Sequence, residues 1–511
     1  MSFNPPSLSR LITISLSVLL VSLILVPFVS AKCDVIPAGK SFWVRLLDPL
    51  ASYSSKPHTP IRAILIQSPE CGNTPVFPAG IEVDGLVISV RRVGLGFLHD
   101  TASLEIRFDR LVTNAGSVLN ITSQLVEIDN AREKVRRGVI HGIRATDTPQ
   151  GRITSRLIHL PTFNPYSDIG LIVYRAFTVL PESEIYLPSG TDLRLQLNEP
   201  LFVGDQPELP HVSFELDGRE RGEIELLLQH SSKRTTTTFG KDADLVNIVF
   251  VGSADQLKDV FTSSSWLPAD RNSSHAFLKE FGAFLSFSNY PSMPISNQLL
   301  NGQPQDSAWQ KSLNSYGKRE HLRIWSEKDT VLGRQAWLGA YTRETSAVLS
   351  LRYHKFIHHI DPNLDEGVNM LVRDLTLSGC VESVRLLTRP DIPRVLTNAT
   401  GDAMRTEGAL TVVHLQPCTR PALRYASEIP PIPAGPRSRV RRYFRDRVLL
   451  YKSDVIRGNV VYGAFDLCRM SIRSFQHHRR VTVGDDGLPL TPVSPETLFP
   501  HFTEEALTIP Q

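Results

Sequence analysis

The sequence predicts an α+β protein, with a β-rich N-terminal domain of barrel or sandwich type followed by a domain that combines a sheet with helices. Three observations favour this fold class. At 511 residues the chain is longer than one ordinary domain. Residues 32–205 hold short runs rich in β-branched and aromatic residues, separated by Gly, Pro, Asn and Asp. Residues 241–425 alternate apolar runs with stretches of helical periodicity.

The first 31 residues differ in composition from the rest. One positive residue, Arg10, precedes an uncharged apolar stretch at residues 11–26, which Pro27 ends. Because small residues precede position 32, we expect a cleaved secretory signal peptide. An uncleaved N-terminal membrane anchor is the alternative, since the stretch is nearly long enough to span a bilayer. In both cases we expect an exported protein, periplasmic or membrane-associated in the cell envelope.

Residues 32–205 contain the strand-like runs SFWVRLL, IRAILIQ, GLVISVRRV, ASLEIRF and LRLQL. Residues 35–52 (VIPAGKSFWVRLLDPLAS) also resemble residues 186–203 (YLPSGTDLRLQLNEPLFV), each a Pro-x-Gly turn followed by an alternating strand. The Pro-Ala-Gly turns, GLVISVRRVGLG and LEIRFDRLV together resemble the TrbI-like β domain of bacterial conjugation and type IV secretion machinery. That resemblance implies a non-catalytic domain that assembles in the cell envelope.

Residues 206–240 are polar and end in HSSKRTTTTFG, which indicates a linker. Beyond it, LVNIVFVG is typical of a buried strand, and SADQLKDVFTSSSW predicts a helix with Ser253 as its N-cap. SHAFLKEFGAFL predicts a second helix, and HLRIWSE, AWLGAYTRE and AVLSLRYHKFIHHI predict strands. LDEGVNMLVRDLTLSG predicts a helix that ends at Gly379. SVRLL and ALTVVHL complete a mixed or antiparallel sheet.

Residues 426–511 are expected to form a Pro- and Arg-rich tail. ASEIPPIPAGPRSR is linker-like, while FRDRVLLY and NVVYGAF are candidates for edge strands. The basic run at residues 437–447 is most simply a solvated strand face, and the other interpretation is a surface for anionic lipid headgroups or an acidic partner. The net charge of the whole chain is only +3, which argues against nucleic acid as a partner.

Five cysteines in an exported chain raise the question of disulfides. Cys33 and Cys71 are placed to pair within the N-terminal domain, whereas Cys380, Cys418 and Cys468 would leave one thiol over. Buried free thiols are an equally good interpretation. No spacing typical of a zinc site occurs among the five.

The segment FIHHIDPNLDEG, residues 356–367, has two interpretations. In the structural one, Asp361-Pro362 begins a helix, and Asn363 with Glu366 forms a capping box. In the functional one, the adjacent histidines at the strand end and the acids behind them form part of a site for an anion or a metal ion.

Polar residues on two further strands extend the functional interpretation. His321 and Arg323 share a face of the HLRIW strand, and Arg343 lies near the end of the AWLGAYTRE strand. If these strands are neighbours, imidazole, carboxylate and guanidinium groups meet beside a helix N-terminus. The candidate residues are, as acid–base groups, His359, Asp361 and His321; as ligands of a divalent metal, His358, His359 and Asp361; and as anion-binding groups, Arg323 and Arg343. The sequence contains no nucleophile elbow or phosphate-binding glycine loop.

Residues 242–390 are similar to the LssY C-terminal domain family. The matching blocks occur in order: DLVNIVFVGSADQLKDVFTSSSWLPAD, NGQPQDSAWQKSL, REHLRIW, QAWLGAYTRE and FIHHIDPNLDEG. The chain departs from the family pattern at Trp309, where the family has Phe, and at Glu320, where a basic or His residue is common. The second departure puts in doubt any site that needs a ligand at position 320. The resemblance implies a bacterial envelope protein and does not supply a reaction.

Two functions are compatible with these observations. The first is a binding or scaffolding module without chemistry, whose partners are envelope proteins or anionic lipid headgroups. The second is a metal-dependent or acid–base hydrolase that acts on phosphate-containing envelope substrates. The sequence leaves open whether the chain is an enzyme, and a divalent metal is the one cofactor that the second function would involve.

Overall fold

The computed structural model describes residues 34–71, 74–97, 99–113, 116–130, 132–157, 169–170, 173–174, 177–203, 215–271, 273–350, 355–419 and 425–454. The predicted signal peptide lies outside these residues. Within them, no helix combines the length and the apolar character needed to cross a membrane.

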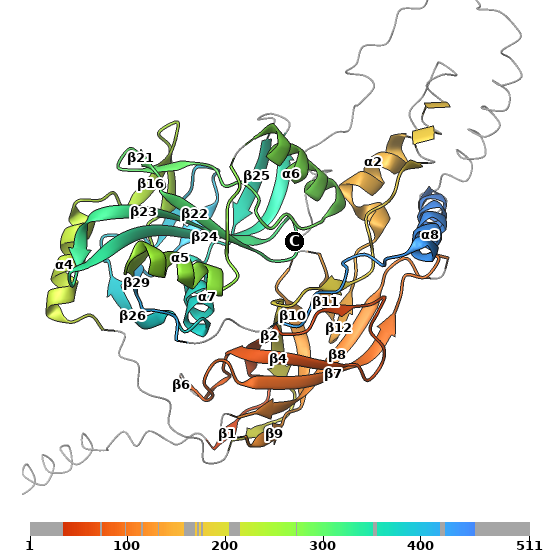
Figure 1. Cartoon of the computed structure of the whole chain (residues 1–511), viewed down its shortest axis with the longest axis horizontal. Helices are drawn as coiled ribbons and strands as arrows, with labels where there is room; N and C mark the ends of the chain where they lie inside the picture. The colour runs from red at the N-terminus through yellow and green to blue at the C-terminus, as the bar shows by residue number, and fades with distance from the viewer. Residues whose placement is uncertain are drawn as a thin grey trace, which may run out of the picture.

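Two sheet-based bodies make up the molecule, and Figure 1 shows the N-terminal body in red to orange and the C-terminal one mainly in green to cyan. The N-terminal body is a nine-stranded antiparallel sheet. Its strands, in spatial order, are β10 (Ser123–Ile128), β14 (Asp192–Leu197), β2 (Ser41–Leu46), β4 (Pro60–Gln67), β7 (Glu82–Arg91), β8 (Ser103–Val112), β12 (Val139–His141) and β11 (Lys134–Arg136), with β9 (Val118–Asn120) paired to β8.

This sheet curls until it is nearly a barrel. The Ser123 hydroxyl at the start of β10, an edge strand, donates to the Phe108 carbonyl of β8 at 2.8 Å. The Ile121 N–H just before β10 donates to the Asp109 carbonyl at 2.9 Å. Alternating apolar residues from the strands, such as Leu65, Val83 and Leu104, fill the interior and are fully buried. The predicted β-rich N-terminal domain is therefore confirmed.

The two similar Pro-x-Gly units pair with each other along their whole length. β1 (Val35–Ile36), β2 and β3 (Leu50–Ala51) of the first unit bond antiparallel to β15 (Leu201–Phe202), β14 and β13 (Tyr186–Leu187) of the second. Gly39 and Gly190 occupy equivalent turns with φ of 86° and 85°, a conformation that favours glycine. Their N–H groups donate to Leu197 and Leu46 carbonyls at 2.8 Å each. The repeat in sequence thus corresponds to a local two-fold symmetry.

The C-terminal body is built on an eight-stranded sheet. Its strands, in spatial order, are β19 (Leu267–Pro268), β22 (Ser307–Ser312), β23 (Arg319–Val331), β24 (Arg334–Ser350), β18 (Ile248–Val251), β29 (Ala409–Leu415) and β26 (Val381–Thr388), with β25 (Lys355–Ile360) paired to β24. Only the β18–β29 pair is parallel among these described strands. One smaller sheet consists of β17 (Asp242–Leu245), β16 (Arg234–Thr237), β20 (Gln298–Leu300) and β21 (Gln303–Pro304), and another of β27 (Val395–Thr397) and β28 (Ala403–Arg405). In the N-terminal body, β5 (Glu70–Cys71) pairs with β6 (Thr74–Pro75).

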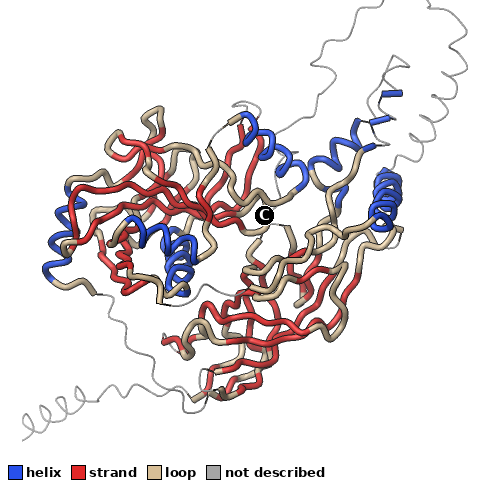
Figure 2. Tube along the Cα trace, viewed as in Figure 1, coloured by secondary structure: helices blue, strands red, loops and turns tan. Residues whose placement is uncertain are grey.

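Helices cover both faces of the eight-stranded sheet, as the tube in Figure 2 shows. On one face lie α5 (Ala254–Ser263) and α7 (Leu364–Leu377), whose Phe261 and Leu371 join a core with Phe250 and Trp266. On the other lies α4 (Gly218–Gln229). The helix α6 (Ser274–Ser286) packs its Phe284 on the end of the sheet near β25. An α+β domain is therefore confirmed, and Ser253 caps α5 in a capping box with Gln256.

The range 206–240 is not a plain linker. It contains α4, in which Ile224 and Leu227 are buried against the sheet, and β16, formed by RTTT. The Asp217 side chain caps α4 by accepting from the Glu220 N–H at 2.8 Å. The linker prediction was wrong here because it weighed the polar Ser/Lys/Thr cluster and overlooked this cap and the apolar spacing behind it.

The edge strand predicted at FRDRVLLY is also wrong, because these residues lie in a helix, α8 (Pro436–Asp454). Pro436 suits the first helical position. Arg442, Arg445 and Leu449 follow helical spacing, and this side of α8 packs on the N-terminal domain near α2 (Pro149–Leu157) and the short helix η1 (Ala145–Asp147). The other candidate edge strand, NVVYGAF, lies outside the described residues.

Two of the three cysteines that the sequence analysis grouped in the C-terminal part form a disulfide. Cys380 and Cys418, 38 residues apart, are bonded, and they lie beside β26 and β29 at the end of that strand pair. Cys71 is disulfide-bonded as well. Cys33 and Cys468 lie outside the described residues, so their expected pairing stays a prediction.

Candidate functional site

Alternation along β23 sorts its polar residues onto two faces of the sheet. Arg319, His321 and Arg323 lie on one face, while Glu320 lies on the other. The neighbouring strand β24 is in register, so Arg319 faces Glu344 and Glu320 faces Arg343. The strands that the functional interpretation required to be neighbours are neighbours, but their polar groups form two separate clusters.

Glu344 is the centre of the first cluster. Its carboxylate accepts two hydrogen bonds from Arg319, at 2.5 Å from Nε and 3.0 Å from Nη2. His321 Nδ1 lies 3.2 Å from one carboxylate oxygen and His358 Nδ1 lies 2.9 Å from the other. Both imidazole contacts are within ion-pair distance but lack hydrogen-bond geometry. We call Glu344, Arg319, His321 and His358 the Glu344 cluster.

Burial and charge shift the pKa values of the two histidines of this cluster in opposite directions. Burial lowers the pKa of His321, and the nearby Arg323 lowers it further, so His321 is neutral at pH 7. Burial also acts to lower the pKa of His358, but Glu344 and Glu280 outweigh it and raise that pKa. For Glu344, burial opposes ionisation, yet Arg319 and His358 hold its pKa well below the usual value. The cluster is therefore a buried, charge-paired group.

The two predicted anion-binding arginines already have protein partners. Arg323 is buried and donates to Asp244 at 2.7 Å, to the Ser296 carbonyl at 3.0 Å and to the Ser296 hydroxyl at 3.1 Å. Arg343 lies on the opposite face and forms an ion pair with Asp129 of the N-terminal domain. The structure does not bring these two guanidinium groups together.

His359 and Asp361 do not join His321. His359 Nδ1 is 2.7 Å from an Asp402 carboxylate oxygen, and its side chain is 41% exposed. Asp361 follows the last residue of β25, so strand alternation no longer sets its direction, and its side chain accepts from the Asn363 N–H at 2.9 Å. A register shift between Glu344 and Ser346 further alters which β24 residues β25 faces.

The metal interpretation therefore lacks the expected geometry. His358 points toward Glu344 while its neighbour His359 pairs with Asp402, because adjacent strand residues point to opposite faces. Within the described part of the chain, no three or more His, Cys, Asp and Glu side chains gather in a way that can hold a metal ion. Asn363 instead acts as predicted by the structural interpretation, since it caps α7 by accepting from the Glu366 N–H at 3.3 Å.

A second charged cluster lies where the two domains meet. Arg45 of β2 donates to Asp192 at 2.6 and 2.7 Å and also pairs with Asp374 of α7. Lys311 of β22 lies 2.5 Å from the same Asp374. Burial raises the pKa of nearby Glu320 to about 7, although Lys311 acts to lower it. We call Arg45, Asp192, Asp374, Lys311 and Glu320 the interface cluster.

Sequence reasoning missed the partners that complete these clusters. Asp402 lies between β27 and β28, and Asp374 is in the last turn of an amphipathic helix. Arg45 is 147 residues from Asp192 and 329 from Asp374. A buried Asp inside the apolar pattern of α7 was the one local signal, because an unpaired buried carboxylate is unfavourable.

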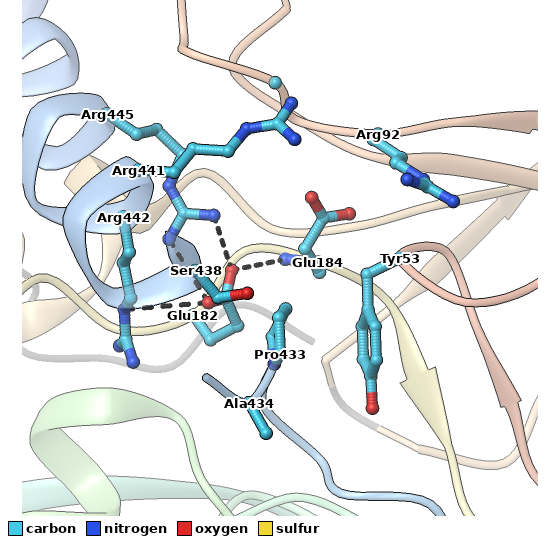
Figure 3. Close-up of a pocket in the computed structure, with 11 residues that line it drawn as sticks. Tyr53, Arg92, Glu182, Glu184, Pro433, Ala434, Ser438, Arg441, Arg442 and Arg445 are labelled. Carbon is cyan, nitrogen blue, oxygen red and sulfur yellow. Dashed lines mark hydrogen bonds and ion pairs between the residues drawn. The ribbon is translucent and has the colours of Figure 1, made fainter. Parts of the chain in front are cut away.

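A cavity of about 310 Å³ lies between the N-terminal domain and α8, and Figure 3 shows the residues that line it. The N-terminal domain contributes Tyr53, Arg92, Glu182 and Glu184, and arginines of α8 form the opposite wall. The sequence had suggested a binding surface at this basic segment only as the alternative to a solvated strand face, and it did not indicate which residues face the segment.

Comparisons with known proteins identify the second domain. Residues 228–410 match the family model described as LssY C-terminus. No curated protein matches the chain. Among solved structures, the chain is similar to ComB10 of the Com type IV secretion system of Helicobacter pylori, at 13% sequence identity and a TM-score of 0.19, over 34% of this chain and 93% of that one.

The family match includes the β-strands and helices on which the Glu344 cluster and His359 lie, and it extends on both sides of the range that the sequence motifs had indicated. The chain therefore contains, at residues 228–410, a domain of the LssY C-terminus family.

Proposed function

We propose that this chain is an exported binding or scaffolding module of the bacterial cell envelope and does not catalyse hydrolysis. The main support is that His321, Arg323 and Arg343, three of the predicted site residues, already have partners within the protein. Glu344 holds Arg319 and two imidazoles, and Arg323 is bound to Asp244 and Ser296. A substrate would have to displace these contacts from a site that is almost inaccessible to solvent.

The domain contact supports a scaffolding role. Arg45 and Asp374 form a buried ion pair across it, and Arg343 pairs with Asp129. The Asn314 side chain also donates to the Tyr186 carbonyl at 2.8 Å. Buried pairs favour one relative orientation, because separating them exposes uncompensated charges in a low-dielectric contact. A fixed orientation of two domains is what a scaffold requires.

Two features support export. The Cys380–Cys418 disulfide suits an oxidising compartment. The uncharged apolar stretch at residues 11–26, ending at Pro27, is typical of a secretory signal. Fractionation of cells that produce the full chain tests this part, and recovery in the cytoplasm with reduced Cys380 and Cys418 would contradict it.

The hydrolase alternative is supported by one specific observation. His359 is partly exposed and has a carboxylate partner, Asp402, at 2.7 Å, which is the arrangement of an oriented general base. In this alternative His359 acts without His321 or Asp361, and Asp402 orients its imidazole.

A single experiment separates the two functions. The purified full chain is screened against phosphomonoesters and phosphodiesters, with and without added divalent metals, beside His359→Ala and Asp402→Asn, and its metal content is measured. The proposal expects no stoichiometric metal and no turnover above that of the two variants. Turnover that is lost in His359→Ala, while its Tm stays at the wild-type value, would establish the hydrolase instead.

A further inference from the structure

We propose that the cavity between α8 and the N-terminal domain binds a phosphate group, carried by a lipid headgroup or by a soluble phosphoester. The proposal goes beyond the scaffolding function, on which it rests only in treating the chain as a binding protein. None of its residues belongs to the Glu344 cluster, the interface cluster or the His359–Asp402 pair.

The walls of the cavity are fixed by contacts of α8. Leu449 and Leu450 pack with Ala145 and Leu180 of the N-terminal domain. The Leu180 N–H donates to Asp446 at 2.9 Å, and Arg442 donates to the Leu180 carbonyl at 2.8 Å. Because these contacts hold both walls, the cavity exists before any ligand arrives, and less conformational entropy is lost on binding.

Positive charge exceeds negative charge in the cavity. Four guanidinium groups line it, from Arg92, Arg441, Arg442 and Arg445, against the two carboxylates of Glu182 and Glu184. Figure 3 shows that Arg92 approaches from the N-terminal domain and the other three from α8. Guanidinium groups bind phosphate oxygens well, since their paired N–H donors match two oxygens at once.

The two carboxylates are occupied by protein partners. Glu182 accepts from Arg445 at 2.8 and 3.2 Å, and also from the backbone N–H groups of Ser183 and Glu184. Glu184 accepts from the Ser52 hydroxyl at 2.5 Å, and burial raises the pKa of its carboxyl. Hydrogen bonds from these protein donors partly offset the negative charge of both carboxylates, so an anionic ligand is repelled less.

Arg92 and Arg441 are left for a ligand. Both are exposed, and neither forms an ion pair with any residue that the structure describes. The N-terminus of the 19-residue helix α8 also reaches the cavity through Ala434 and Ser438. Its partial positive charge and the Ser438 hydroxyl add to the attraction of the arginines for an anion.

The outer face of α8 explains why a lipid headgroup is one of the two sources. Val440, Phe444 and Tyr451 are 57%, 58% and 71% exposed and recur at helical spacing, with exposed Arg437 and Arg441 beside them. Apolar residues flanked by arginines are typical of helices that lie on anionic membranes. A helix on the membrane surface would bring the cavity close to phospholipid headgroups.

The test uses the purified full chain and two matched double variants. Arg92→Gln with Arg441→Gln removes the cavity charges, and Arg136→Gln with Arg137→Gln removes the same charge from exposed positions of the N-terminal domain outside the cavity. Binding of inorganic phosphate is measured by calorimetry. Binding to vesicles of phosphatidylcholine, with and without phosphatidylglycerol, is measured by sedimentation.

The proposal expects the cavity variant to lose affinity about tenfold or more, while the control variant stays within about twofold of the wild type. Phosphate binding with this pattern identifies a soluble phosphoester site, and binding to phosphatidylglycerol vesicles alone with this pattern identifies a lipid headgroup site. Equal losses in the two variants, or no binding of either probe by the wild type, would overturn the proposal. Such a failure would leave the scaffolding function standing, since that function is tested by turnover and metal content.

Discussion

Glu320 is the residue whose ionisation most directly affects the stability of the contact between the two domains. It lies on the face of β23 opposite the Glu344 cluster and is only 3% exposed. Burial raises its pKa to about 7, while Lys311 opposes the change. Asp374, in the same cluster, behaves in the opposite way: burial would raise its pKa, but Arg45 and Lys311 lower it to about 2. The Glu320 carboxyl of the interface cluster therefore changes its protonation state near neutral pH.

This difference predicts a specific pH dependence. A carboxyl whose folded pKa exceeds the unfolded value stabilises the fold fully below the unfolded value, near 4.5, and this contribution is lost as pH rises through about 7. The free energy of unfolding should therefore fall from pH 5 to pH 8, with a slope of up to about 1.4 kcal/mol per pH unit for one proton. Urea unfolding at a series of pH values measures this slope.

Glu320→Gln should make the fall in the free energy of unfolding less steep. Part of the slope should remain, because burial also raises the pKa of Glu133 to about 7. The control is Glu407→Gln, which removes an exposed carboxylate and should leave the wild-type slope. A profile in Glu320→Gln as steep as in the wild type would show that Glu320 does not titrate in this range.

At the scale of elements, helix caps explain where the helices of the second domain begin. Ser253 accepts from the Gln256 N–H at 3.2 Å, and the Gln256 side chain accepts from the Ser253 N–H at 2.9 Å. Asn363 supplies the corresponding cap of α7. These caps are short-range patterns, so the sequence predicted both helices. α4 has a cap as well, but the polar composition around it suggested a linker.

Removing the capping box of α5 should have a moderate cost. Ser253→Ala leaves the Gln256 N–H without its side-chain acceptor and should lower the free energy of unfolding by about 1 kcal/mol, measured by urea denaturation. Ser253→Asp restores an acceptor at the helix N-terminus and should recover most of that loss. If Asp destabilises the protein as much as Ala does, the cap is not what Ser253 contributes.

At the scale of the whole molecule, buried ion pairs join the two domains into one unit. Asp129 is 2% exposed. It forms ion pairs with Arg343 and, at 3.8 Å, with Lys318, both of the other domain. Arg45 and Asp374 form a second such connection. The segment before α8 returns to the N-terminal domain as well, where Tyr186 donates to Glu428 at 2.5 Å. The chain therefore crosses between the domains more than once.

A double-mutant cycle on Asp129 and Arg343 tests this connection. Asp129→Asn or Arg343→Gln alone should destabilise the protein by about 3 kcal/mol, because each leaves a buried charge without its partner. The double variant should lose less than the sum, with a coupling energy of about 1–3 kcal/mol from urea unfolding. The exposed pair Arg334–Glu382 lies within one domain and serves as the control, with an expected coupling below about 1 kcal/mol. Strict additivity at Asp129 and Arg343 would mean that the pair does not hold the domains together.

The sequence alone determined the features that depend on neighbours along the chain: the alternating strands of the N-terminal domain, the Pro-x-Gly repeat, the caps at Ser253 and Asn363, and the family of residues 228–410. Local turn chemistry and hydrophobic periodicity are short-range, so they can be read without a structure. The helix α8 shows the limit of this reading, since its basic run fits a strand face or a helix until its packing partner is known.

Only the tertiary structure decided which polar groups meet. His321 and His358 converge on Glu344, His359 turns to Asp402, and Arg343 reaches Asp129 in the other domain. These outcomes depend on the register of β23, β24 and β25, on a register shift after Glu344 and on the contact between domains. A one-residue change in register moves a side chain to the opposite face of a sheet, and for that physical reason the spacing of residues in the sequence cannot establish a site built from several strands.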